Sequence, residues 1–202
     1  GLAGRCSGGL RAHLQEGAEV KRSHPGKAAR DGIVCAELAK RGLTGATEII
    51  EGRFGYVQAF AGGQADWERL TGALGERFEI CSVCFKPYPA CRHFHAPFDA
   101  VRAIARRERF ATEDIAKVEI GIYEVGVAGH DYKHTENLLA AQMSAPVTTA
   151  LAIAFGDVTV PSFDRANLER PDVKRLIDVT EVYIDPECDR IYPGRRSGVV
   201  RI

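Results

Sequence analysis

The stretch APFDAVRAIARRERFATEDIAKVEIGIY, residues 96–123, contains the change of hydrophobic period that decides the fold class. Residues 96–107 have helical spacing, whereas residues 117–123 alternate between apolar and polar side chains, as a strand does. We therefore expect a helix followed by a strand. The side chains predicted to face the core are Phe98, Val101, Ile104 and Ala105 in the helix and Val118, Ile120 and Ile122 in the strand.

The flanking residues predict more elements of both kinds. Residues 138–155 form a long helical pattern that is interrupted or restarted at Pro146, and Pro171 begins a helix over residues 172–177. Further strands are expected at residues 77–85, 179–184 and 198–202. Because strands outnumber any evident strand–helix–strand unit, we predict an α+β domain with a mostly antiparallel sheet.

The preceding part of the chain, up to about Leu74, is helical in period. After His24 and Pro25, small and apolar residues recur at helical spacing, which implies a close helix neighbour. These residues are Ala28, Ala29, Gly32, Ile33, Cys35, Ala36 and Ala39. Gly42 ends this helix. Shorter helices are expected at residues 44–51, 56–60 and 67–74. The join between the helical part and the α+β part is expected at residues 75–80.

Composition excludes several classes of protein. The chain has 202 residues, of which 45% are hydrophobic, and its 27 Lys and Arg balance 27 Asp and Glu. Zero net charge gives no global field for nucleic acid or an anionic membrane surface, so neither is an expected partner. No G-x-G-x-x-G motif follows a strand and no complete P-loop is present. The composition is that of a folded, water-soluble protein.

The ends of the chain suggest an excerpt from a longer protein. The only methionine is Met143, and the last five residues have the pattern of a strand that has just begun. No run of eighteen apolar residues and no signal-peptide pattern is present. We therefore expect a cytoplasmic protein.

Six cysteines occur in a chain large enough to need no disulfide framework, so reduced thiols are expected. A metal site is the alternative, with the candidate ligands Cys81, Cys84, Cys91, His93 and His95. A strand at residues 77–85 would place Cys81 and Cys84 on opposite faces, and no Gly lies between them to form a knuckle turn. We therefore predict no metal and no cofactor.

Two clusters concentrate positive charge. The first, Lys21, Arg22, His24, Lys27 and Arg30, surrounds the start of a helix. Cations at a helix N-terminus oppose the macrodipole, so an anionic ligand is one reason for their presence and a solvated helix start is the other.

The second cluster extends over residues 86–95, KPYPACRHFH, from the predicted strand into a helix. Its two prolines stiffen the loop. The imidazoles of His93 and His95 can exchange protons near neutral pH, while Lys86 and Arg92 can hold a carboxylate or stabilise developing negative charge. A purely structural role for the histidines is the alternative.

A third polar stretch, residues 130–134, has the sequence HDYKH and lies between a strand and the long helix. Such a loop suits a substrate loop or lid. A solvated connection fits equally well.

Four segments in the same order resemble the MmgE/PrpD family. Residues 21–32 resemble its K-x-x-H-x-G-x-A-A-x-x-G motif, and residues 86–93 its K-x-Y-P-x-C-x-x-H type of segment. Residues 52–60 resemble the G-x-x-G-F segment, and residues 143–156 the later F-S-x-x-Y helix. Together these segments cover nearly the whole chain.

The resemblance implies a large all-helical domain and a smaller α+β lid domain with an active site between them. On this basis residues 1–78 are the C-terminal part of the helical domain and residues 79–202 are a lid domain with an incomplete C-terminus. The implied chemistry is metal-free proton transfer next to a carboxylate of a di- or tricarboxylic acid. Dehydration of 2-methylcitrate is the first expectation, with decarboxylation of cis-aconitate and epimerisation of iminodisuccinate as alternatives.

The resemblance also assigns site residues. The predicted catalytic residues are Lys21, Lys86, His93 and His95, and the predicted substrate-binding residues are His24, Tyr88, Cys91, Arg92 and His130. Cys91 occupies a place where some relatives have histidine, so the residue that moves the proton stays open. A homodimer is expected. The competing hypothesis is a non-catalytic fragment that folds, pairs with another copy and binds anions.

Overall fold

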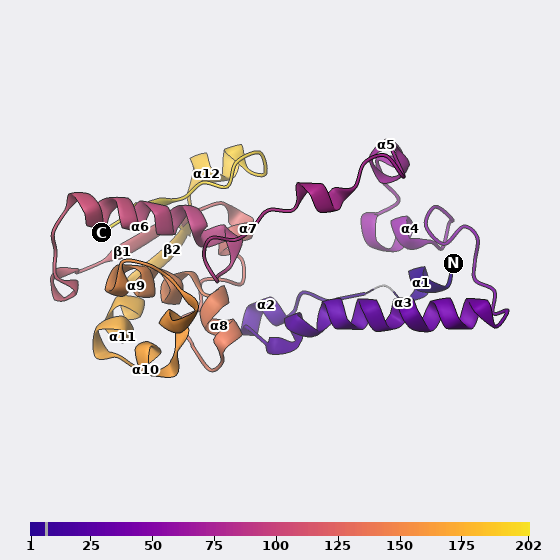
Figure 1. The fold of residues 1–202 in the computed structure, drawn as a ribbon. Helices are drawn as coiled ribbons and strands as arrows, with labels where there is room; N and C mark the ends of the chain where they lie inside the picture. Colours follow the sequence, from indigo (N-terminus) through magenta and orange to yellow (C-terminus); the bar gives the residue numbers. More distant parts are fainter. Residues whose placement is uncertain (7) are drawn as a thin grey trace. The chain divides into compact units, whose positions relative to one another are not determined.

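The computed structural model describes residues 1–6 and 8–202, and it divides the chain into two compact units. The first comprises Gly1–Leu10 and Val20–Phe85, and the second comprises Arg11–Glu19 and Lys86–Ile202. Figure 1 shows the elements of each unit along the chain.

The first unit is helical. Its α-helices are α1 (Leu2–Arg5), α3 (His24–Lys40), α4 (Tyr56–Ala61) and α5 (Trp67–Thr71). Short 3₁₀ helices cover Glu19–Ser23, at the junction with the second unit, and Glu79–Ser82. Pro25 lies in the first turn of α3, as predicted, because a proline there costs no helical hydrogen bond. Asp66 caps α5 by accepting a hydrogen bond from the backbone of Arg69 at 3.0 Å.

The predicted strand at residues 77–85 was wrong. Residues 79–82 form a 3₁₀ helix, and Phe78, Ile80, Val83 and Phe85 are all exposed. These residues have high strand propensity, but a strand also requires a partner to accept its backbone hydrogen bonds. The first unit provides no strand among the residues described.

Two other expectations for the first unit need correction. Residues 44–51, predicted as a helix, do not form one: residues 47–51 form turns, and Gly45 lowers the helix propensity of the segment. Helix α3 contacts α1, yet Cys35 is the buried residue that the structure assigns to α3, and the small residues of its predicted packing face are exposed. Ile33, at 68% exposure, lies open to solvent.

The second unit combines a small sheet with helices. Its strands are β1 (Val118–Ile122), β2 (Thr180–Ile184) and β3 (Val199–Arg201). Its longer helices are α6 (His95–Arg107), α9 (Ala145–Phe155) and α11 (Pro171–Asp178). Shorter helices are α2 (His13–Glu16), α7 (Glu124–Val127), α8 (Leu138–Met143), α10 (Arg165–Leu168) and α12 (Pro186–Ile191), with 3₁₀ turns at Arg92–Phe94, Thr112–Asp114 and Val160–Phe163.

The α+β class is confirmed, but the sheet is mixed and the predicted antiparallel majority was wrong. The strand order is β2-β1-β3. Strand β1 pairs in parallel with β2, with Val118 opposite Thr180, and antiparallel with β3, with Gly121 opposite Val199. Parallel neighbours need a long crossover, which residues 123–179 supply with their helices. The sequence pattern did not reveal this strand–helix–strand unit, because several short helices interrupt it.

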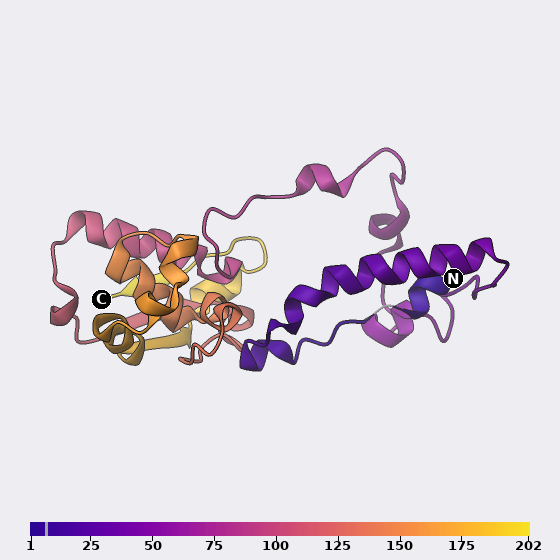
Figure 2. The same cartoon turned by 60° about the horizontal axis from the view of Figure 1, so that its bottom comes forward.

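The core of the second unit lies between the sheet and three helices that pack on one another, α6 against α9 and α9 against α11 (Figure 2). Phe98, Val101, Val118, Ile120 and Ile122 are fully buried, as the two hydrophobic periods predict. Each such side chain contributes roughly 1.5–3 kcal/mol of burial free energy. Ala105 is exposed, against expectation, because helical spacing buries a residue only where a neighbouring element covers it.

None of the helices among the described residues is both long enough and apolar enough to cross a membrane.

Candidate functional site

The loop that leads into α6 is fixed by backbone hydrogen bonds. The amide of Cys91 donates to the carbonyl of Gln142 in α8 at 2.9 Å, and the amide of Phe94 donates to the carbonyl of Cys91 at 3.1 Å. Phe94 is fully buried and anchors the turn in the core. The side chains of Cys91 and His93 therefore project from a rigid segment.

His130 approaches this segment from the turn after α7. Its amide donates to Val127, and its carbonyl accepts a hydrogen bond from Ala145 at 2.8 Å. Gly129 has a φ of +72°, a backbone conformation that glycine adopts readily and that this turn requires. The imidazole is 1% exposed, and its Nδ1 lies 2.8 Å from the carbonyl oxygen of Met143.

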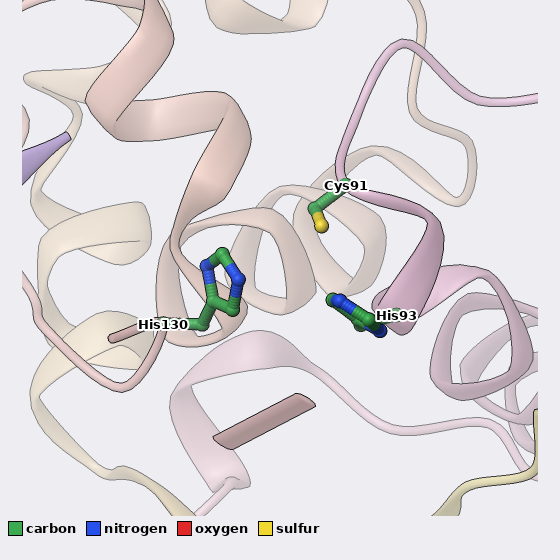
Figure 3. Close-up of side chains that lie close together, drawn as sticks. All are labelled: Cys91, His93 and His130. Carbon is green, nitrogen blue, oxygen red and sulfur yellow. The ribbon is translucent and has the colours of Figure 1, made fainter. Parts of the chain in front are cut away.

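Cys91, His93 and His130 meet inside the second unit. One thiol or imidazole atom from each residue lies within 4.8 Å of the others, and the two rings are 5.5 Å apart between centroids. Figure 3 shows the three side chains around a common space. The sequence predicted each of them as a site residue, but it did not predict that His130 joins the other two.

Sequence reasoning missed Tyr123, which completes this cluster. Its hydroxyl lies 2.6 Å from Nδ1 of His93, and its ring stacks on Tyr192 at 4.1 Å between centroids. Burial raises the pKa of Tyr123 to about 12, so the phenol is neutral at pH 7. Its position as the last residue of the predicted strand, next to a loop, was the available signal.

The cations of the same loop lie at the surface. Lys86 and Arg92 are both exposed, and Nζ of Lys86 donates to the carbonyl of Ala90 at 3.2 Å. An exposed guanidinium and an exposed ammonium are groups that can bind carboxylates.

His95 is placed apart from the three-residue cluster. It is buried against Tyr88 and Phe98, and its Nε2 lies 3.5 Å from the carbonyl of Ala90. Its Nδ1 has no hydrogen-bond partner among the described residues. Burial lowers the pKa of His95, so this ring is neutral at pH 7.

Tyr88 is part of a separate polar network. Its hydroxyl donates to Oδ1 of Asp99 at 2.5 Å and accepts a hydrogen bond from Arg102 at 3.0 Å. Burial raises the pKa of this phenol. The network fixes the predicted substrate-binding loop to the outer face of α6.

The first cationic cluster belongs to the first unit. Lys21 lies in a 3₁₀ helix and His24 begins α3, and both are half-buried. Asp31 forms ion pairs with Lys27 at 2.8 Å and Arg30 at 2.7 Å. Hydrogen bonds from Lys27 and Arg30 lower the pKa of Asp31. An internal partner therefore accounts for two of the five cations.

A small pocket of about 150 Å³ lies beside the start of α3. Its lining includes Cys6, His24, Lys27 and Asp31. Lys27 of this lining is already paired with Asp31.

The loop at residues 130–134 is held to the second unit at several points. The hydroxyl of Tyr132 donates to Ala140 at 3.0 Å, and Nζ of Lys133 donates to Asp178 at 2.6 Å. His134 pairs with Glu136 and stacks on Tyr132. These contacts order the loop that begins at His130.

The alternative ligand set of three cysteines and two histidines is not brought together as a whole. No strand separates Cys81 from Cys84, because residues 79–82 form a 3₁₀ helix. Both cysteines are exposed residues of the first unit. Cys91 and His93 come together with His130 instead of His95.

Comparisons with known proteins identify the family of this chain. The profile of the MmgE/PrpD C-terminal domain matches residues 88–202, more than half of the chain, and that of the MmgE/PrpD N-terminal domain matches residues 1–68. The chain therefore belongs to the MmgE/PrpD family, as its motifs predict.

Curated relatives include three proteins named for the same reaction. The cis-aconitate decarboxylase-like protein oryM of Aspergillus oryzae is 28% identical over 98% of this chain and 43% of its own length. Human cis-aconitate decarboxylase is 25% identical over 84% of the chain and 36% of its length. The cis-aconitate decarboxylase of Aspergillus terreus is 24% identical over 93% of the chain and 42% of its own length. The chain thus spans about two fifths of the length of these relatives.

Proposed function

We propose that the protein containing this chain is a carboxylic-acid lyase that decarboxylates cis-aconitate or a closely similar tricarboxylate. The observation that carries the proposal is the pair of imidazoles, His93 and His130, 5.5 Å apart within the second unit. Membership of the MmgE/PrpD family supports a lyase-type reaction, and relatives named cis-aconitate decarboxylase support this substrate.

Decarboxylation makes two demands that these residues suit. The bond between a carbon and its carboxylate breaks, CO₂ leaves, and the electron pair that stays behind must be stabilised until the carbon takes up a proton. A histidine near neutral pH can deliver that proton, which contributes about 10²–10⁴ in rate. Lys86 and Arg92 can bind the remaining carboxylates and stabilise the negative charge.

Dehydration of 2-methylcitrate and epimerisation of iminodisuccinate stay as alternatives. Both reactions also move a proton at a carbon next to a carboxylate, so they would use the same cations and imidazoles. The family resemblance made the dehydratase the first expectation, whereas the names of the relatives favour the decarboxylase. Lys21 and His24 remain proposed site residues of the first unit on the strength of their motif.

Self-association is a second proposal, carried by a different observation. Ile33, Val34 and Leu38 of α3 are 68%, 49% and 40% exposed. Apolar side chains grouped on one helix favour a partner surface, and a second copy of the chain is the partner we propose. Light scattering tests this directly: a dimer supports the proposal and a monomer at high concentration contradicts it. We also propose a cytoplasmic location.

The proposed reaction can be tested with the full-length protein. NMR spectra recorded in D₂O, after treatment with a chelator, would follow cis-aconitate, 2-methylcitrate and iminodisuccinate separately. We expect CO₂ release from cis-aconitate and one deuterium in the product, because the proton that replaces CO₂ comes from a group that exchanges with solvent. His93→Gln and His130→Gln should each slow this step. Turnover of none of the three acids would contradict the proposal.

A further inference from the structure

We propose that Cys91, His93 and His130 form a binding site for a zinc-like divalent metal ion, with three protein ligands and a fourth position for water or a carboxylate oxygen. The sequence predicts no metal, because a strand at residues 77–85 would place two of the candidate ligands, Cys81 and Cys84, on opposite faces. The folded second unit brings a different set together. Metal binding by these three residues does not depend on the proposed reaction.

The donor atoms match the preference of zinc. One thiolate and two imidazoles form a mixed sulfur and nitrogen set, which Zn²⁺ and Co²⁺ bind in tetrahedral geometry. Zinc bonds of about 2.0–2.3 Å place neighbouring ligand atoms roughly 3.3–3.8 Å apart. The three atoms here lie within 4.8 Å of one another. Side-chain movements of about 1 Å would therefore bring them to the separations of zinc ligands.

Hydrogen bonds orient both rings as metal sites require. Nδ1 of His130 lies 2.8 Å from the carbonyl of Met143, which can only accept a hydrogen bond. Nδ1 therefore carries the proton, and the lone pair of the neutral ring is on Nε2. A backbone carbonyl behind a ligating histidine is a recurrent feature of zinc sites.

His93 has an equivalent partner in Tyr123. The tyrosine oxygen, 2.6 Å from Nδ1, can accept a hydrogen bond from an Nδ1–H group, which leaves the lone pair of the neutral ring on Nε2. Tyr123 is held by its stack on Tyr192, 4.1 Å between centroids, so it can fix the ring orientation.

Burial and charge also fit a metal. Cys91 and His130 are buried and His93 is half-buried, so the site has a protected interior and one partly accessible ligand. Binding Zn²⁺ releases the thiol proton, and the thiolate then neutralises one of the two metal charges. The nearby cations, Lys86 and Arg92, oppose metal binding weakly because both are exposed and screened by solvent.

Cobalt makes the site visible without any assay of turnover. The reduced chain, freed of metal and of any purification tag, would be titrated with Co²⁺. We expect one equivalent to bind, with the intense visible bands of tetrahedral Co²⁺ and the near-ultraviolet band of a thiolate–cobalt bond. Zn²⁺ should then displace the cobalt and bleach both bands.

Variants assign the bands to residues. Cys91→Ser should abolish the thiolate band, and His93→Gln or His130→Gln should weaken Co²⁺ binding at least about tenfold, since each removes a ligand. Circular dichroism would confirm that each variant is folded. Cys81→Ser and Cys84→Ser are the matched controls and should bind as the parent does.

Three results would overturn the proposal. The first is the absence of a thiolate–cobalt band in the parent chain. The second is a band that survives Cys91→Ser. The third is a band lost in Cys81→Ser or in Cys84→Ser. Failure of the proposed reaction would leave these spectra unchanged, so the two proposals are separable. Where both hold, Zn²⁺ should inhibit turnover by occupying the imidazole nitrogens.

Discussion

The hydroxyl of Tyr123 lies 2.6 Å from Nδ1 of His93 and links the end of β1 to the turn that begins α6. The two rings meet edge to face, with centroids 5.4 Å apart. Because the backbone of Tyr123 continues directly from the central strand, the sheet fixes the orientation of this imidazole. The strand thus connects the core of the second unit to its cluster of Cys91, His93 and His130.

Removal of this hydroxyl tests its role as a positioning group. Tyr123→Phe should keep the stack on Tyr192 but release His93, which we expect to lower kcat of the full-length protein about 10–100-fold. The free energy of unfolding should fall by about 0.5–1.5 kcal/mol, because the hydrogen bond to the half-buried His93 is lost. Tyr192→Phe, which keeps both rings and the hydrogen bond to His93, is the control. Equal kcat values in the two variants would show that the Tyr123 hydroxyl does not position His93 for the reaction.

The core of the second unit depends on α9. Leu151 is fully buried in this helix, so Leu151→Ala should lower the free energy of unfolding by about 2–5 kcal/mol through lost burial and a cavity. Val160→Ala, at a side chain that is 64% exposed, should change it by less than about 0.5 kcal/mol. Urea unfolding of both variants checks the contrast. A loss in Leu151→Ala as small as that in Val160→Ala would show that α9 does not form the core.

Stability should depend on pH through His95. Burial lowers the pKa of this imidazole below its usual 6.5, so the folded state binds fewer protons than the unfolded state. The stability associated with His95 is therefore present above pH 6.5 and is lost as the pH falls below that value. His95→Leu removes the titrating group.

The measurement compares parent and variant by urea unfolding at pH 7.5 and pH 5.5. The parent should lose more free energy of unfolding between these values than His95→Leu does. Other histidines contribute equally to both proteins and cancel in the difference. Identical losses would mean that His95 titrates in the folded protein as it does in the unfolded chain.

Much of the second unit could be predicted from local pattern. The alternation at residues 117–123 fixed β1, the proline at residue 171 fixed the start of α11, and the helical spacing at residues 96–107 fixed α6. Each of these signals is local and is reinforced by burial against neighbours. Strand direction was not predictable, since it depends on where a crossover delivers the next strand.

Residues 77–85 show why local propensity can mislead. Their β-branched and aromatic side chains favour a strand, but the first unit supplies no pairing edge among its described residues. The candidate site has the same dependence on long-range contacts. His130 lies far along the sequence from Cys91 and His93, and hydrogen bonds to Met143 and Ala145 bring it to them. Spacing along the sequence cannot report such a meeting.

The most direct test of the central claim, proton transfer next to a bound carboxylate, is kcat of the full-length protein on cis-aconitate with and without Lys86. Lys86 is exposed, so Lys86→Ala should leave the fold intact while lowering kcat at least about 100-fold through lost charge stabilisation. Lys174→Ala, at an exposed lysine paired with Glu169, should retain the kcat of the parent. Parental turnover in Lys86→Ala would contradict the account.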